Sequence, residues 1–124
     1  MIRCTNICCP TLEVEVMENN NTFDLVIIGA SAAGLSASIY AARRNLRFCI
    51  ITKDIVGEVI RSGEVDNWPG IIYTTGIELS QMFERHVASY GVDIKNGLAV
   101  TTITKDGSHY KIEAVNRSGE IQSF

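Results

Sequence analysis

A short glycine-containing turn between an apolar run and a run of small residues constrains this chain more than any other feature. The apolar run covers 23–28 (FDLVII), the turn covers 29–34 (GASAAG), and a small-residue stretch begins at 35. This order predicts a buried strand, a tight turn and the start of a helix. The first N–H groups of a helix lack partners within it and lie at the positive end of its dipole. The turn is therefore predicted to hold a phosphate group, and its setting indicates a dinucleotide.

Three positions of this turn have distinct roles. Gly29 lets the chain turn tightly, and Gly34 lets the helix pack closely against the strand. Ser31 stands where the usual pattern has another glycine, so its Cβ must be accommodated, although its hydroxyl can donate a hydrogen bond to a phosphate oxygen. A purely structural turn is the alternative, and the strand-turn-helix setting favours nucleotide binding over it.

A second apolar run, 48–51 (FCII), follows a helix expected from about Ala32 to Arg44. Such a β-α-β unit crosses over right-handed and lays its strands parallel, which places the turn at the carboxyl edge of the sheet, where ligands bind. An acidic residue often ends the second strand and holds a ribose hydroxyl. Here Thr52 and Lys53 stand at that place and Asp54 comes slightly late. Ribose would then be held by Thr52, the Lys53 backbone or Asp54, unless these residues form only a solvated turn.

The remainder of the chain predicts one more helix and several strands. A glycine-punctuated connection covers 53–76 and includes the turn-forming sequence NWPG at 67–70. The capping box TGIE at 75–78 predicts a helix that runs to about Tyr90. Residues 92–94, 98–104, 110–115 and 121–124 alternate like strands of an antiparallel β-meander. The fold class is therefore α/β, with a doubly wound parallel sheet and a β-meander.

The bulk of the chain fits one globular domain. It has 124 residues and a formal net charge of -3, which gives nucleic acid or an anionic membrane no basic surface to bind. We expect a cytoplasmic protein, because no apolar run is long enough to span a bilayer. The four cysteines, Cys4, Cys8, Cys9 and Cys49, form no CxxC pair and are predicted to be reduced thiols. No metal site and no catalytic side chain is predicted.

Two boundaries are expected. Residues 1–22 are predicted to be an irregular N-terminal extension, with Met17 as a hypothetical natural start, and 23–124 form the domain. The chain ends at Phe124 within an apparent strand, which predicts that the domain is truncated at its C-terminus.

Residues 23–115 resemble the N-terminal half of the FAD domain in the low-molecular-weight thioredoxin reductase family, of the pyridine nucleotide-disulfide oxidoreductases. Three segments match in order, namely FDLVIIGASAAGLSASIYAARRNL, IITKDIVGEV and GEVDNWPGI. The last is the most specific, because this family carries a Glu-Val-x-Asn-aromatic-Pro-Gly run there. The resemblance implies a partial Rossmann-like FAD/NAD(P)-binding domain with FAD as its cofactor.

The resemblance also implies which residues contact FAD. The glycine loop of the family holds the pyrophosphate, the segment after the second strand lines the ribityl chain and flavin, and the Asn of the last motif approaches the isoalloxazine. The corresponding residues here are Gly29, Ser31, Ala32, Ala33, Gly34, Thr52, Gly57, Glu58 and Asn67. The backbone near Leu98 or Ala99 is implied to touch the adenine.

Four of these matches depart from the family pattern, at Ser31, Ala32, Val56 and Glu58. The family has glycine at the first and third of these positions, commonly proline at the second and glutamine at the last. A carboxylate beside a flavin would disfavour its anionic reduced form. The alternative is that the Glu58 side chain points into solvent.

The family passes electrons from NAD(P)H through FAD to a CxxC disulfide, and this sequence contains neither a CxxC nor a second glycine loop. We therefore expect FAD binding within such a flavoprotein. The complete enzyme would use NAD(P)H and a thioredoxin-like partner, and a homodimer is compatible with this interpretation. The alternative is a non-catalytic nucleotide-binding module or a half-domain that needs a partner chain. His86 is predicted to pack on the apolar face of its helix, and His109 to be solvated.

Overall fold

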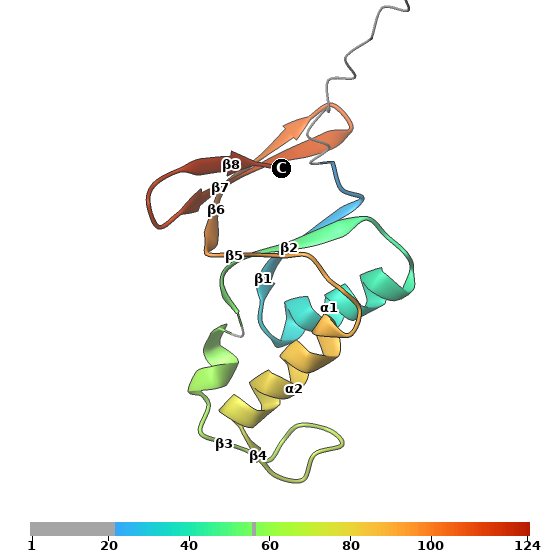
Figure 1. The fold of residues 1–124 in the computed structure, drawn as a ribbon, viewed down its shortest axis with the longest axis vertical. Coiled ribbons are helices and arrows are strands. Elements are labelled where there is room, and N and C mark those ends of the chain that lie inside the picture. Colours follow the sequence, from blue (N-terminus) through green and yellow to red (C-terminus); the bar gives the residue numbers. More distant parts are fainter. Residues whose placement is uncertain (1–21, 56) are drawn as a thin grey trace, which may run out of the picture.

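The computed structural model describes residues 22–55 and 57–124. Its central element is a parallel sheet with the order β1-β2-β5, formed by β1 (Leu25–Ala30), β2 (Phe48–Ile55) and β5 (Ile94–Asn96) (Figure 1). The predicted parallel β-α-β unit is confirmed. The expectations for the extension up to residue 21, including Met17 and three of the cysteines, lie outside the described residues, as does Val56.

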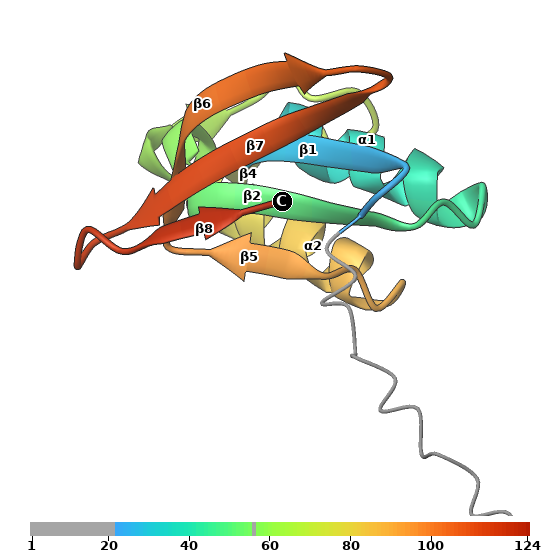
Figure 2. The same ribbon diagram turned by 90° about the horizontal axis from the view of Figure 1, so that it is seen from above.

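Two helices cover one face of this sheet. They are α1 (Ala32–Arg43) and α2 (Gly76–Ala88) (Figure 2). The capping box at the start of α2 forms as predicted, because the Glu78 N–H donates to Thr75 Oγ1 over 3.2 Å and the Thr75 N–H donates to Glu78 Oε2 over 3.1 Å. The helix ends two residues before the predicted end at Tyr90.

The opposite face carries the antiparallel meander β6-β7-β8, formed by β6 (Leu98–Asp106), β7 (His109–Asn116) and β8 (Ile121–Ser123) (Figure 2). The meander prediction is confirmed for these strands. It is wrong for 92–94, because Ile94 belongs to β5 and pairs in parallel with Ile50 of β2. After α2 the chain crosses back to the sheet, and such a crossover leads to a parallel neighbour.

β2 is buried on both faces, which explains its continuous apolar run. Ile50 faces the helices and packs in one cluster with Ile27, Leu35 and Val87. Cys49 and Ile51 face the meander and pack in a second cluster with Leu98, Ile112 and Ala114. The domain is thus a three-layer sandwich, with the helices, the parallel sheet and the meander stacked in that order.

The connection predicted for 53–76 is more structured than expected. β2 continues to Ile55, a 3₁₀ helix η1 (Gly57–Arg61) follows, and β3 (Glu64–Val65) pairs antiparallel with β4 (Thr74–Thr75). In the loop between β3 and β4, Trp68 packs against Phe83 of α2 with ring centroids 5.1 Å apart. This aromatic contact anchors the loop to the helical layer.

Candidate functional site

A cleft of about 210 Å³ lies where β1 runs into α1, beside the carboxyl end of β2. It brings together the turn after β1 and the last part of β2 with Gly57 behind it, two segments that are separated in the sequence by the whole of α1. The residues that line it are Ile28, Gly29, Ala30, Ser31, Ala33, Gly34, Thr52, Asp54 and Gly57. Six of the nine residues predicted to bind a cofactor therefore meet in one cleft. The other three, Ala32, Glu58 and Asn67, do not line it.

The turn approaches the helix so closely that Gly34 has no room for a side chain. A Cβ at Gly34 would lie 1.9 Å from the carbonyl oxygen of Gly29. Gly29 itself has a φ of +94°, in the region that favours glycine. Both glycines are thus required by the shape of the turn, and the packing role predicted for Gly34 is confirmed.

The N-terminus of α1 opens into this cleft without a side-chain cap. Ser31 is the N-cap residue in an extended conformation, its side chain makes no capping hydrogen bond, and the first turn of the helix has no acidic residue. The N-terminus of α2, by contrast, is closed by Thr75 and Glu78. The first turn of α1 can therefore offer its N–H groups and its positive dipole end to an anion in the cleft.

The hydroxyl of Thr52 is engaged with the backbone at the edge of the cleft. Its Oγ1 accepts a hydrogen bond from the Ala30 N–H over 3.2 Å and donates one to the Asp54 carbonyl oxygen over 2.5 Å. Thr52 is 5% exposed. The hydroxyl thus links the end of β1 to the end of β2, which the prediction of a direct ribose or ribityl contact did not foresee.

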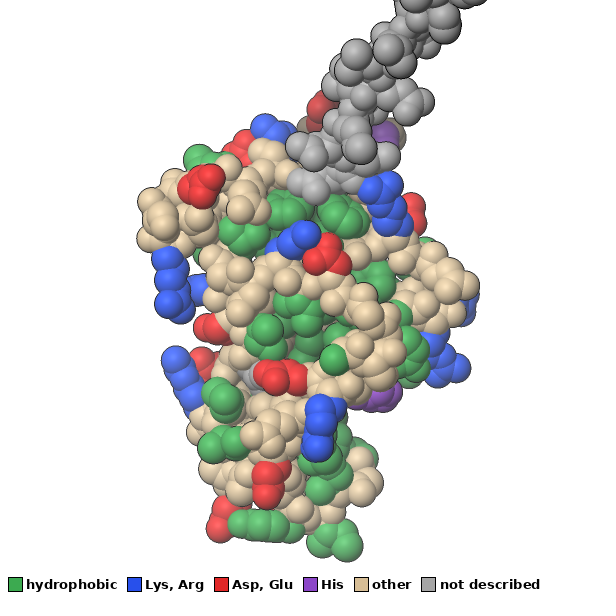
Figure 3. All heavy atoms as spheres, viewed as in Figure 1, with side chains coloured by type: hydrophobic (Ala, Val, Ile, Leu, Met, Phe, Trp, Pro, Cys, Tyr) green, Lys and Arg blue, Asp and Glu red, His purple; other side chains and the backbone are tan. Residues whose placement is uncertain are grey.

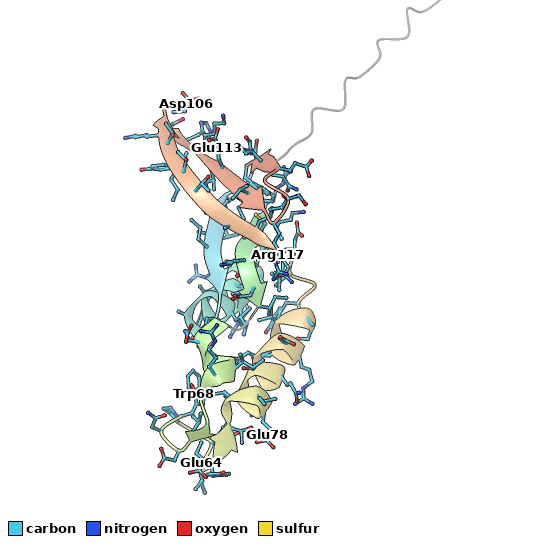
Figure 4. The ribbon with its side chains drawn as sticks, turned by 90° about the vertical axis from the view of Figure 1, so that its left-hand side faces the viewer. Glu64, Trp68, Glu78, Asp106, Glu113 and Arg117 are labelled. Atoms are coloured by element: carbon cyan, nitrogen blue, oxygen red, sulfur yellow. The ribbon has the colours of Figure 1, made fainter. Side chains whose placement is uncertain are left out.

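Glu58 and Asn67 lie on the surface. The Glu58 carboxylate is 2.9 Å from Arg61 Nη1 within η1, and its side chain is 84% exposed. The alternative that Glu58 points into solvent is the one that the structure shows. Asn67 is exposed in the loop between β3 and β4, and its neighbour Trp68 lies beside the helical layer (Figure 4). Its predicted approach to an isoalloxazine stays a prediction.

A second cleft, of about 490 Å³, adjoins the first and shares Asp54 with it. It is formed by the ends of β2 and β5 together with the turn between β7 and β8, which brings Arg117 back beside the parallel sheet (Figure 4). Its lining residues are Lys53, Asp54, Ile55, Asn96, Gly97, Asn116, Arg117 and Ser118. Sequence reasoning considered Lys53 and Asp54 but missed the others, because no local motif marks them.

Among the described residues, Cys49 and the two histidines lie outside both clefts. Cys49 is fully buried, and this burial raises the pKa of its thiol to about 11, which leaves it unreactive. His109 is exposed as predicted. His86 is also exposed, with its ring 5.9 Å from that of Tyr90, so the prediction that it packs on the apolar face is wrong. Val87, next to it on the helix, is the residue that is buried in the core.

Three other kinds of functional feature are relevant in the described part of the chain: a basic patch, a membrane-spanning helix and a metal-binding group. Lys and Arg side chains are scattered over the face seen in Figure 3 and do not gather into one patch. Among residues 22–55 and 57–124, no helix is long and apolar enough to cross a membrane. No group of three or more metal-binding side chains lies together in the same part of the chain.

A parallel β-α-β unit with an uncapped helix N-terminus at the carboxyl ends of its strands is the arrangement of the Rossmann-like class of α/β folds. No protein-family model matches the chain. Alkyl hydroperoxide reductase F of Staphylococcus aureus (strain NCTC 8325 / PS 47) is 32% identical over 106 residues, a match that covers 86% of this chain and 21% of that protein.

Solved structures of thioredoxin reductases share the fold. That of the T. acidophilum thioredoxin reductase is 38% identical with a TM-score of 0.69, over 74% of this chain and 30% of that one. The structure of a ferredoxin-flavin thioredoxin reductase from Clostridium acetobutylicum is 25% identical with a TM-score of 0.71, and the match covers 82% of this chain and 34% of that one. The homologues of this chain are thus thioredoxin reductases and alkyl hydroperoxide reductase F, of the pyridine nucleotide-disulfide oxidoreductase family. The chain spans about a fifth of the length of the curated relatives it matches, 21%.

Proposed function

We propose that this chain binds FAD as part of a thioredoxin-reductase-like flavoprotein. The observation that carries the proposal is the open N-terminus of α1 in the cleft, with Gly34 held against Gly29 and no side chain capping the helix. A pyrophosphate is the group that such an arrangement binds best, because it accepts several N–H hydrogen bonds and its charge favours the positive end of the helix. The similarity to a ferredoxin-flavin thioredoxin reductase supports FAD as the dinucleotide.

Each part of FAD has a place in this proposal. The pyrophosphate lies on the turn 29–34, where the hydroxyl of Ser31 donates to a phosphate oxygen. The adenosine extends into the second cleft, where Asn96 and Gly97 lead into the backbone of Leu98 and Ala99. The ribityl chain passes Gly57, and the isoalloxazine extends toward Asn67. The long, two-armed shape of FAD suits two adjoining clefts better than one compact pocket would.

FAD, when bound, supplies transfer of two electrons between a pyridine nucleotide and a disulfide. The residues of this chain bind and orient it: the glycine turn places the pyrophosphate, and the buried end of β2 supports that turn. In the proposed complete enzyme, the electron donor would be NAD(P)H, and the acceptors would be a CxxC disulfide and then a thioredoxin-like protein. The sequence of this chain contains neither a CxxC nor a second glycine loop, so the proposal assigns the disulfide and the binding of NAD(P)H to other parts of the complete enzyme.

A charge placed in the cleft tests the proposal directly. Ser31→Asp introduces a carboxylate at the open N-terminus of α1, where it is favourable for the helix but competes with a pyrophosphate. Ser36→Asp places the same charge on an exposed position of the same helix, outside the cleft, and is the matched control. The measurement is the dissociation constant of FAD, followed by quenching of Trp68, the single tryptophan of the chain.

We expect S31D to weaken FAD binding by more than about tenfold without lowering the melting temperature, and S36D to bind FAD like the wild type. ADP-ribose should compete with FAD because it keeps the pyrophosphate and adenosine, whereas FMN should compete poorly. Equal affinities of S31D and S36D, or FMN competing as well as ADP-ribose, would show that the pyrophosphate does not bind at α1.

One observation favours the second candidate, a half-domain that needs a partner chain. Among the described residues β1 pairs only with β2, and Leu25 and Ile28 on β1 are 37% and 50% exposed. An apolar strand with one open edge readily accepts another strand. Gel filtration distinguishes the two candidates, because a self-sufficient module retains FAD as a monomer, whereas a half-domain retains it only in an assembly.

A further inference from the structure

We infer that Thr52 is a positioning residue that fastens the phosphate-binding turn to the end of β2, and that its hydroxyl donates no hydrogen bond to the pyrophosphate. This inference rests on the proposed FAD site, because it assigns a role to a residue that lines that cleft. It differs from the role that the family resemblance implies for Thr52, which is contact with the ribityl chain and flavin.

The pairing of β1 with β2 shows why a fastening is needed at this point. Ile28 of β1 pairs with Ile51 of β2, and Ala30 of β1 pairs with Ile55 of β2. The chain thus advances two residues along β1 but four residues along β2. The two strands therefore lose their regular register just where β1 enters the turn. A ladder that is interrupted in this way leaves backbone groups without their usual partners.

The Thr52 hydroxyl fills this gap in the ladder. Oγ1 accepts from the N–H of Ala30, which is 2% exposed, and donates to the carbonyl oxygen of Asp54 within the irregular stretch of β2. Ala30 immediately precedes the N-cap residue of α1. By holding Ala30, the hydroxyl holds the start of α1 in place over the cleft.

The same two hydrogen bonds exclude donation to a phosphate. A threonine hydroxyl has one proton, and in Thr52 that proton is directed to Asp54. Phosphate oxygens only accept hydrogen bonds, so Thr52 has no donor left for them. Its effect on a bound pyrophosphate therefore passes through Ala30 and the turn.

Substitutions that separate the hydroxyl from the rest of the side chain test this role. Thr52→Val keeps the shape and removes the hydroxyl, whereas Thr52→Ser keeps the hydroxyl and removes the methyl group. The full chain is titrated with FAD well below its melting temperature, and hydrogen exchange of the Ala30 amide is measured without FAD. Thr52→Ala, compared with Thr52→Ser, repeats the test if the valine variant does not fold.

We expect T52V to bind FAD about tenfold more weakly and T52S to bind within about twofold of the wild type, because only the valine leaves buried backbone groups unpaired. The Ala30 amide should exchange at least about tenfold faster in T52V but not in T52S. If Thr52 only supported the fold, T52V and T52S would both lower the melting temperature, and they would not differ in FAD affinity or in the exchange of the Ala30 amide.

The inference is wrong if T52V binds FAD like the wild type, or if T52S binds as weakly as T52V, which would assign the effect to the methyl group. If the wild type itself fails to bind FAD, the proposed function fails. Hydrogen exchange of the Ala30 amide then still tests whether Thr52 fastens the turn. Unchanged exchange in T52V refutes this role. Faster exchange in T52V, with wild-type exchange in T52S, supports it.

Discussion

Replacing Gly34 by alanine tests the contact on which the whole cleft depends. The new Cβ would lie 1.9 Å from the carbonyl oxygen of Gly29, and Cβ atoms essentially never approach another heavy atom to less than 3.0 Å. Reaching that limit demands a shift of about 1.1 Å between the first turn of α1 and the turn after β1. Both sides of the contact are backbone, so no side chain can rotate away to relieve it.

The size of the effect follows from two opposing contributions. Overpacking costs about 1–3 kcal/mol, and a clash between backbone segments belongs at the upper end of that range. Alanine regains at most about 1 kcal/mol through its higher helix propensity. We expect G34A to lower the free energy of unfolding by about 2 kcal/mol, and the melting temperature by about 8 °C for a domain of this size. FAD retention should fall as well, because the displaced turn holds the pyrophosphate.

Gly63→Ala is the matched control. Gly63 is exposed, and a Cβ added there meets no atom within 4 Å. Its substitution should be neutral or slightly stabilising through the unfolded chain. Urea unfolding of the wild type, G34A and G63A gives the comparison. Equal midpoints for the two variants would refute the close approach of Gly34 to Gly29, and with it the account of why the turn requires glycine.

Four other predictions concern single side chains. Thr75→Ala removes the cap of α2 and should lower the free energy of unfolding by about 1 kcal/mol in urea titrations. The Thr75 N–H lowers the pKa of Glu78 below its ordinary 4.5, so the stabilisation from Glu78 is present above that pH and is lost as the pH falls through the folded-state pKa. The stability difference between the wild type and Glu78→Ala should accordingly shrink between about pH 7 and about pH 3. Ser31→Ala should weaken FAD binding by about tenfold, since it removes a hydrogen bond to a charged group. Cys49 should remain unmodified by iodoacetamide at about pH 8 in the native protein and react in urea, as measured by peptide mass analysis.

Each of these outcomes can contradict the structure. A pH-independent difference for E78A would mean that its carboxylate does not cap the helix. Wild-type affinity in S31A would assign phosphate binding to the backbone alone. Rapid labelling of Cys49 in the native state would mean that the contact between the meander and the sheet opens readily.

Features that depend on neighbouring residues were predicted well from the sequence. The capping box at 75–78 formed between the predicted residues, because its hydrogen bonds join positions three apart. The turn between β1 and α1 was also recognised, since glycine at 29 and at 34 answers to local backbone geometry. The run of four apolar residues at 48–51 identified β2, because a short continuous apolar run is typical of a strand that is buried on both faces.

Features that depend on distant segments were not predictable. The sequence predicts that residues 92–94 belong to the meander, because a short apolar-polar alternation fits either sheet, and only the crossover after α2 places Ile94 in the parallel sheet. The second cleft combines three separate segments, and Arg117 reaches it only through the path of the meander. His86 is exposed because the helix turns Val87, and not its neighbour, toward the sheet.

The sequence by itself determined that residues 23–51 form a strand, a glycine turn, a helix and a second buried strand, because composition and spacing decide those local conformations. Tertiary structure decided what Thr52 does. Whether a hydroxyl at the end of a strand faces a ligand or the backbone depends on the register of the neighbouring strand, and the shift between Ile28 and Ala30 directs it to the backbone. Register is a relation between segments far apart in the chain, so only the folded domain establishes it.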